Sequence, residues 1–155
     1  MAAAVGEVNV VTAMKDSKAV IGGEGNGGII VPDLHYGRDA LIGIALFLSH
    51  LARAKKKASQ LRASYPAYFI SKNKIELTPQ IDVDNVLEKV KAKYASEKVN
   101  TIDGVKIDFE AEKEWVHLRK SNTEPIIRIY AESQNEKKAD MLAKRIISDI
   151  QNIIA

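Results

Sequence analysis

The sequence predicts an α+β fold in two parts. Over residues 61–155 we expect a carboxy-terminal domain built as a small antiparallel-rich sheet with two helices on one face, and over residues 1–60 the tail of a larger domain. Apolar residues alternate with charged ones in the second part and also recur there at helical spacing. Around Lys55 to Pro66, basic and small polar residues replace a long apolar stretch, which marks the boundary.

The first part offers few elements. Val5 to Lys15 predicts a short helix, Ala19 to Gly22 a buried strand, and Gly28 to Val31 its partner across a glycine-rich loop. From Asp39 to about Lys57, apolar residues cover almost the whole circumference of a helix, so we expect it to be buried on several sides. Because so few elements cannot supply the neighbours of that helix, this part is expected to be the tail of a larger domain.

The second part contains enough elements for a complete domain. Val105, Ile107 and Phe109 alternate with charged residues, which predicts a strand with one apolar face. We expect the helices to cover that face. Ser133 and Glu136 have the spacing of a capping box for the last helix. The expected elements are a strand (67–77), a helix (83–94), three strands (105–110, 115–119 and 126–132) and a helix (135–154).

The composition is that of an ordinary globular protein, with 46% hydrophobic and 28% charged residues. The absence of cysteine excludes disulfides and thiolate metal sites and makes the cytoplasm the expected location. No run approaches the roughly 18 apolar residues that cross a bilayer, so we expect no membrane association. A net charge of +3 is small for a nucleic-acid-binding protein.

A glycine-rich loop, Gly22 to Gly28, lies between two predicted strands. That placement argues against a nucleotide-binding fingerprint, which joins a strand to a helix. Its glycines let a ligand approach the backbone, and Glu24 and Asn26 are its only side chains able to recognise one. A carboxylate and an amide suit sugar hydroxyls. The alternative is a hairpin with two polar residues at its tip.

A second loop, Arg119 to Pro125, is richer in groups that bind anions. It combines a two-pronged cationic donor, two hydroxyls and a residue that tolerates left-handed backbone, which together suit a phosphate dianion. These candidate phosphate-binding residues are Arg119, Ser121, Asn122 and Thr123. The alternative is a tight turn whose polar side chains satisfy their own backbone. Glu124 would repel an anion, so we expect it to point away from the site or to orient Arg119. His117, on the same strand face as Arg119, is close enough in sequence to approach the loop.

Both loops resemble those of one enzyme family. Arg119-Lys120-Ser121-Asn122-Thr123-Glu124-Pro125, with the strand 126–130 after it, resembles the phosphate-binding loop of the fourth domain in the α-D-phosphohexomutases. Gly23-Glu24-Gly25-Asn26-Gly27-Gly28 resembles the sugar-binding loop of their third domain, and Gly37-Arg38-Asp39-Ala40-Leu41 the start of that domain's last helix. Many members have a glycine in place of Asn122 and a histidine in place of Gly28.

The resemblance implies a substrate-binding part of an isomerase, an intramolecular phosphotransferase that interconverts hexose 1-phosphate and 6-phosphate. It implies a TBP-like fourth domain over residues 61–155, preceded over residues 1–60 by the tail of the third domain, an α/β/α domain. Arg119, Ser121, Asn122 and Thr123 would hold the non-reacting phosphate, and Glu24 and Asn26 the sugar hydroxyls.

The family's phosphoserine lies in its first domain and its Mg²⁺ on an aspartate-rich loop of its second. Neither loop has a counterpart in this sequence, since Asp82-Val83-Asp84 fits the start of a helix better. We therefore expect no catalytic residue and no metal ligand here, and no activity without the upstream domains of the same polypeptide.

The departures at Gly28 and Asn122 favour phosphoglucosamine mutase, with phosphomannomutase or phosphoglucomutase as the alternative. A protein that binds phosphosugars without chemistry is a further possibility. An α+β module that binds nucleic acid is the alternative from a different class. Its signature, exposed aromatic residues interleaved with Arg and Lys on the strands, is not evident, so we expect a phosphosugar partner and no nucleic acid.

Overall fold

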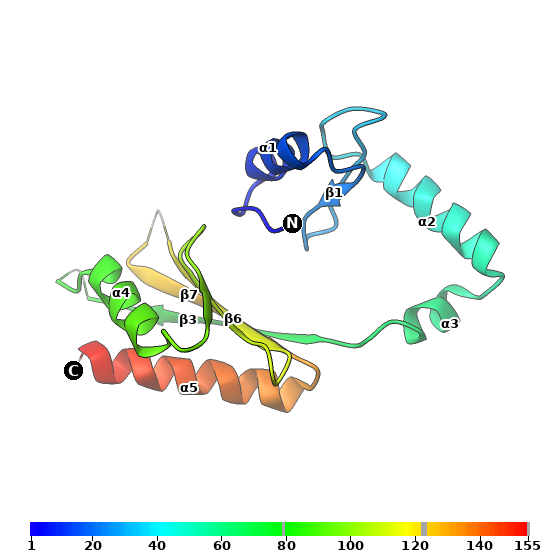
Figure 1. Ribbon diagram of the computed structural model, residues 1–155. Helices are drawn as coiled ribbons and strands as arrows, with labels where there is room; N and C mark the ends of the chain where they lie inside the picture. The colour runs from blue at the N-terminus through cyan, green and yellow to red at the C-terminus, as the bar shows by residue number, and fades with distance from the viewer. Residues whose placement is uncertain (79, 122–123, 155) are drawn as a thin grey trace. The chain divides into compact units, whose positions relative to one another are not determined.

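The computed structural model describes residues 1–78, 80–121 and 124–154. The chain divides into two compact units, Met1–Tyr65 and Pro66–Ala155, each of which is described by itself. Figure 1 shows the helices and strands of both.

The first unit is a small helical unit with one hairpin. Its elements are α1 (Glu7–Ser17), β1 (Gly22–Gly23), β2 (Ile29–Ile30), α2 (Ala40–Ala54) and α3 (Ala58–Ala63). β1 and β2 pair antiparallel, and Met14 of α1 packs so closely over Gly22 that its sulfur lies 2.1 Å from where a Cβ would stand. The buried strand predicted over Ala19 to Gly22 is wrong, because Val20 and Ile21 are 81% and 53% exposed.

α2 begins and ends with clear caps. The side chain of Asp39 accepts hydrogen bonds from the backbone N–H groups of Leu41 (2.8 Å) and Ile42 (3.0 Å), and Lys55 ends the helix in left-handed backbone. The expectation that this helix is buried on several sides is wrong: none of its residues is buried, and Leu41 is 78% exposed. One short hairpin is too small to cover an apolar surface that runs around the helix.

The second unit contains a five-stranded antiparallel sheet in the order β3-β7-β6-β5-β4. This confirms the α+β fold. The three-residue β4 was not predicted, since it is too short to show alternation. The strands are β3 (Phe69–Glu76), β4 (Lys98–Asn100), β5 (Val105–Phe109), β6 (Glu114–Lys120) and β7 (Ile126–Ser133).

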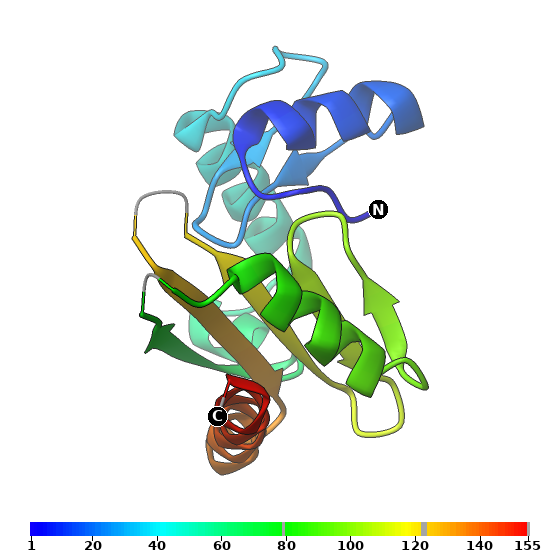
Figure 2. The ribbon, with the colours of Figure 1, turned by 90° about the vertical axis from the view of Figure 1, so that its left-hand side faces the viewer.

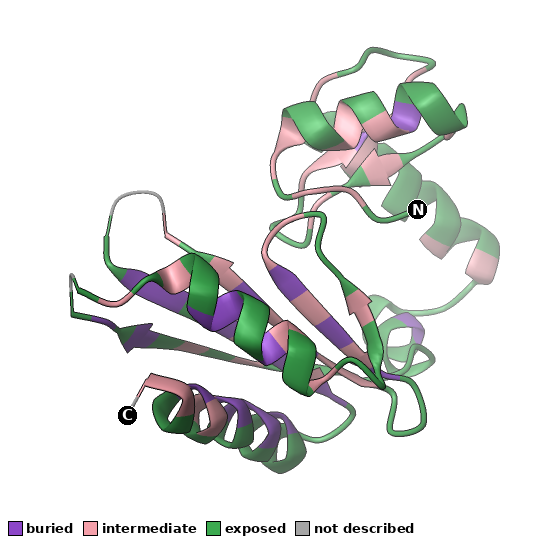
Figure 3. Cartoon of the chain, turned by 60° about the vertical axis from the view of Figure 1, so that its left-hand side comes forward, coloured by how far each residue is buried: buried purple, intermediate pink, exposed green. Residues whose placement is uncertain are grey.

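Two helices, α4 (Val83–Lys93) and α5 (Glu136–Ile154), cover one face of this sheet (Figure 2). α4 buries Val86, Leu87 and Val90, and α5 buries an apolar stripe centred on Ile146 and Ile150. They pack on the inward residues of β5, β6 and β7, which Figure 3 shows as alternating buried positions along the strands. The opposite face of the sheet carries polar, charged and aromatic side chains, among them Lys72, Tyr130 and Lys106.

The start of α5 differs from the expected capping box. The Ser133 hydroxyl donates instead to Glu114 Oε1 on β6, at 2.9 Å. Asn135 takes the capping position, and its Oδ1 accepts a hydrogen bond from the backbone N–H of Lys138 at 3.3 Å. The predicted capping box is therefore wrong, because a residue of a neighbouring strand engages the serine.

Among the described residues, none of the helices has both the length and the apolar character that crossing a membrane requires.

Candidate functional site

The glycine-rich loop is the tight turn of the β1–β2 hairpin. The backbone N–H of Glu24 donates to the carbonyl of Gly28 at 3.0 Å, and that of Gly27 donates to the carbonyl of Glu24 at 3.1 Å. Gly27 has a φ of 95°, which favours glycine. The turn thus brings Glu24 and Asn26 to one end of the hairpin, as expected.

The two polar side chains of this turn are differently engaged. Asn26 Oδ1 accepts a hydrogen bond from the N–H of Gly28 at 3.0 Å, so the oxygen supports the turn and the amide nitrogen is left as a donor. Glu24 is half-buried, and its carboxylate has no hydrogen bond or ion pair with another described residue. Of the pair, Glu24 therefore offers the stronger group for a ligand.

A pocket next to this turn contains an ion pair that sequence reasoning missed. It is lined by Glu7, Gly27, Gly28, Arg38 and Asp39, among others. Arg38 Nε donates to Glu7 Oε2 at 2.8 Å, and the Arg38 backbone N–H donates to Glu7 Oε1 at 3.3 Å. The sequence indicates Arg38 only as part of the start of a helix, because its partner Glu7 lies 31 positions away.

Asp39, the neighbour of Arg38 in the sequence, is the residue whose carboxylate caps the start of α2. The hydrogen bond from the N–H of Ile42, and then the one from His35, lower the pKa of the Asp39 carboxyl below its usual value. His35 Nε2 lies 3.2 Å from Asp39 Oδ2. Asp39 is thus an ionised helix cap.

The loop between β6 and β7 is held by backbone hydrogen bonds at both of its described ends. The N–H of Ser121 donates to the carbonyl of Ile126 at 3.1 Å, which extends the ladder of the two strands. The carbonyl of Pro125 accepts from the N–H of Leu77 at 2.9 Å. Asn122 and Thr123, two of the predicted phosphate-binding residues, lie outside the described residues. The Ser121 backbone amide is thus engaged in the ladder.

Arg119, at the end of β6, forms an ion pair with Asp103. Its Nε lies 3.1 Å from Asp103 Oδ1, and its side chain is 38% exposed. Glu124 lines a pocket with Lys74 and Arg128, and Arg128 is the cross-strand partner of Arg119. The ion pair of Arg119 goes to Asp103 and not to Glu124, so the expectation that Glu124 points away from the site or orients Arg119 stays a prediction.

The uncovered face of the sheet carries aromatic and basic side chains in register. Tyr130 stands between Lys72 on β3 and His117 on β6, and Lys106 on β5 follows His117. Lys72 Nζ lies 5.7 Å from the centre of the Tyr130 ring, and Lys106 Nζ lies 5.2 Å from that of Trp115. Both rings are half-buried rather than exposed, so the expectation that exposed aromatic residues interleaved with Arg and Lys are lacking stays a prediction. The sequence does not show that these cationic and aromatic side chains are neighbours, because they lie on different strands of the sheet.

No group of three or more His, Asp or Glu side chains able to hold a metal ion is found among residues 1–78, 80–121 and 124–154.

Comparison with known proteins decides the family. Residues 1–68 match the family model "Phosphoglucomutase/phosphomannomutase, alpha/beta/alpha domain III", and residues 73–148 match "Phosphoglucomutase/phosphomannomutase, C-terminal domain". The chain belongs to the phosphohexomutase family. Its first unit corresponds to part of domain III and its second to domain IV.

Curated relatives agree with this assignment. The chain is 36% identical, over 97% of its length, to a phosphoglucosamine/phosphogalactosamine mutase of Sulfurisphaera tokodaii. It is 39% identical, over 87% of its length, to a phosphoglucomutase/phosphomannomutase of Thermococcus kodakarensis. These matches cover 32% and 29% of the relatives, so the chain spans about a third of their length.

A solved structure supports the fold. A phosphoglucomutase/phosphomannomutase family protein of Burkholderia thailandensis matches 96% of this chain and 30% of its own, with a TM-score of 0.68 and 24% identity.

Proposed function

We propose that this chain is the substrate-binding part of a phosphohexomutase that interconverts hexose 1-phosphate and hexose 6-phosphate. Residues 1–60 form the end of domain III with the sugar-binding loop, and residues 61–155 form domain IV with the phosphate-binding loop. The observation that carries the proposal is the half-exposed guanidinium of Arg119 at the mouth of a serine-containing loop, inside the segment that matches domain IV.

Arg119 is the principal phosphate-binding group in this proposal. Its Nε is engaged by Asp103, and a guanidinium has two further nitrogens with N–H groups that suit the oxygens of a phosphate. Ser121, Asn122 and Thr123 add hydroxyl and amide donors. Because the loop binds a phosphate by charge and hydrogen bonds, it holds the non-reacting phosphate of either isomer.

Glu24 and Asn26 bind the sugar. The Asn26 amide nitrogen donates to a hydroxyl, and the Glu24 carboxylate accepts from one or more. The chemistry of phosphate transfer belongs to upstream domains, which supply the phosphoserine and bind the Mg²⁺. The chain is accordingly inactive alone, and the cytoplasm is its proposed location.

Glucosamine phosphate is the proposed substrate, ahead of mannose or glucose phosphate. Several relatives at about this identity are phosphoglucosamine mutases by name, including that of Methanococcus maripaludis at 29%. The amino group of glucosamine is cationic when protonated, and the Glu24 carboxylate has no counter-ion among the described residues. A half-buried carboxylate without a partner favours a cationic ligand over a neutral one.

The proposal is tested by titrating the 155-residue chain with glucosamine 1-phosphate, glucose 1-phosphate, mannose 1-phosphate and unphosphorylated glucosamine, followed by NMR. Saturable binding of the phosphates, tightest for glucosamine 1-phosphate, is expected. In Glu24→Gln, which keeps the shape but loses the charge, the preference for glucosamine over glucose phosphate should shrink. Unchanged preference would reject the role of Glu24.

The basic and aromatic face of the sheet gives the nucleic-acid alternative a specific observation of its own. Lys72 and Lys106 lie close to the half-buried rings of Tyr130 and Trp115, so cations and aromatic rings share this face. Filter binding of single-stranded RNA and DNA at increasing salt separates the two functions. A steep loss of affinity with salt, together with no binding of hexose phosphates, would replace the mutase proposal.

A further inference from the structure

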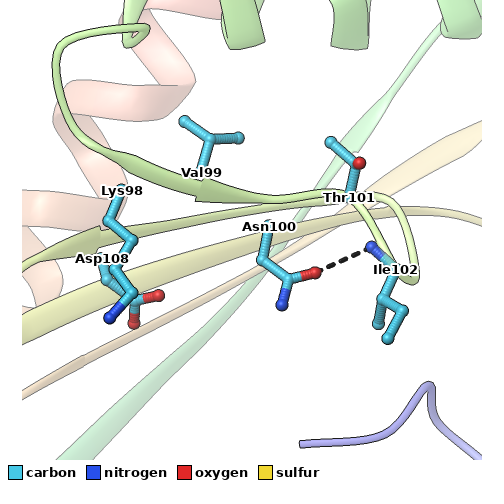
Figure 4. A pocket seen from close by; sticks show the side chains of 6 residues that line it. All are labelled: Lys98, Val99, Asn100, Thr101, Ile102 and Asp108. Atoms are coloured by element: carbon cyan, nitrogen blue, oxygen red, sulfur yellow. Dashed lines mark hydrogen bonds between the residues drawn. The ribbon is translucent and has the colours of Figure 1, made fainter.

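The turn between β4 and β5 reaches the same end of the sheet as the β6–β7 loop (Figure 2). It begins with a side-chain hydrogen bond: Asn100 Oδ1 accepts from the backbone N–H of Ile102 at 2.8 Å, as Figure 4 shows. It ends at Gly104, whose φ of 75° lies in the left-handed region. Both features fix the backbone of the residue between them, Asp103.

The turn lies directly against β6. A Cβ on Gly104 would stand 2.2 Å from the carbonyl oxygen of Leu118 and 3.2 Å from the Cα of Arg119, so only glycine fits this approach. The backbone carbonyl of Asp103 bonds to His117 Nε2. Residues 117, 118 and 119 are thus each in contact with Asp103 or Gly104, and these backbone contacts do not depend on the Asp103 side chain.

With the backbone of the β4–β5 turn held against β6 in this way, Asp103 Oδ1 forms an ion pair with Arg119 Nε at 3.1 Å. We infer that Asp103 is a positioning residue, which fixes the Arg119 guanidinium by its Nε so that the terminal nitrogens present a fixed fork to the substrate phosphate. The inference rests on the proposed function of Arg119. An arginine side chain loses rotamer freedom when it binds, and a neighbour that holds it beforehand reduces that loss.

An opposite effect competes with this one. The Asp103 carboxylate also repels a phosphate dianion, so its removal would strengthen binding if charge alone mattered. The two effects are separable because Asp103→Asn keeps an oxygen that accepts from Arg119 Nε but loses the charge, whereas Asp103→Ala loses both. Positioning predicts that Ala weakens binding and that Asn rescues it; repulsion predicts that both strengthen it.

The experiment measures the dissociation constant of inorganic phosphate for the 155-residue chain, together with the NMR signal of the Arg119 Nε–H group. We expect Asp103→Ala to weaken phosphate binding about tenfold, with Asp103→Asn much closer to wild type, since a hydrogen bond to a charged group is lost only in the first. The Nε–H signal should move in Asp103→Ala. Glu110→Ala is the control, because it changes the net charge by the same amount as Asp103→Ala but removes the carboxylate of the exposed Lys98–Glu110 pair.

The outcomes separate the two claims. If Asp103→Ala binds phosphate as well as or better than wild type while Arg119→Ala binds it weakly, the positioning role is wrong and the phosphate site stands. If Arg119→Ala binds phosphate as well as wild type, or the wild-type chain shows no saturable binding, the proposed function fails and the role of Asp103 fails with it. In the double variant, Asp103→Ala should add nothing to Arg119→Ala.

Discussion

The side chain of Arg38 occupies the space that a side chain on Gly28 would need. A Cβ on Gly28 would lie 2.8 Å from Arg38 Cδ and 3.2 Å from Arg38 Cγ. Gly28 has no left-handed φ, so the constraint is the neighbour rather than the backbone. The glycine at this position and the Glu7–Arg38 ion pair are therefore coupled, and that coupling places an arginine beside the proposed sugar-binding turn.

Replacing Gly28 by alanine should displace Arg38 and break its bond to Glu7. The physical reason is overlap with two carbons of the arginine stem. In an Arg38→Ala background, the same Gly28→Ala change should cost much less free energy of unfolding, which a double-mutant cycle measures. Additive costs in the cycle would show that the two residues are not coupled.

The hydrogen bond between Tyr94 and Asp149 should make the stability of the second unit depend on alkaline pH. Burial, together with the Asp149 carboxylate 2.5 Å away, raises the pKa of Tyr94 to about 12. A raised folded-state pKa contributes stability that is complete below the unfolded value of about 10 and is lost as the pH rises through the folded value.

Denaturant unfolding of wild type and Tyr94→Phe checks this. At pH 7 the variant should be less stable by about 1 kcal/mol, the usual net value of such a hydrogen bond, and the difference should fall between pH 10 and 12. Tyr68→Phe is the control, because the Tyr68 hydroxyl has no hydrogen bond with a described residue. A difference that stays constant through pH 12 would contradict the assigned shift.

In the 155-residue chain, α2 should open far more readily than α5. No residue of α2 is buried, whereas α5 buries Leu142, Ile146 and Ile150 in the core of its unit. A helix without packing is marginal in water. Hydrogen exchange followed by mass spectrometry should show lower protection in residues 40–54 than in residues 139–150, and equal protection would mean that α2 has packing partners.

The chain alone should not convert glucosamine 1-phosphate to glucosamine 6-phosphate. In the proposed function, phosphate transfer requires the phosphoserine and metal loops, which we assign to upstream domains. ³¹P NMR of the substrate with the chain and Mg²⁺, with or without added hexose 1,6-bisphosphate, should show no 6-phosphate. Turnover that depends on protein concentration would mean that the chain contains catalytic groups of its own.

The domain IV fold could largely be predicted from the sequence because its elements follow local rules. The alternation of Val105, Ile107 and Phe109 predicted β5, and helical spacing predicted α4 and α5. β4 was not predicted, because a strand of three residues is too short to show the alternation of apolar and polar side chains. The capping box at Ser133 failed because Glu114, on a different strand, engages the hydroxyl.

The residues that support the candidate site could not be predicted, because their partners lie far away in the sequence. Arg38 bonds to Glu7, 31 positions earlier, and no local pattern links them. Asp103 meets Arg119 only because the β4–β5 turn folds onto β6. The glycine-rich and serine-containing loops were recognisable, since backbone freedom and anion-binding side chains are local properties.

The phosphate-binding role of Arg119 is tested most directly by the affinity of the chain for glucosamine 1-phosphate, followed through the backbone amides of Ser121 and Glu124. In Arg119→Ala the affinity should fall about 30-fold or more, which corresponds to about 2 kcal/mol for a lost charge-assisted pair. Lys98→Ala, which removes a cation elsewhere on the sheet, should leave the affinity unchanged. Equal affinity of Arg119→Ala and wild type would contradict a phosphate site at this loop.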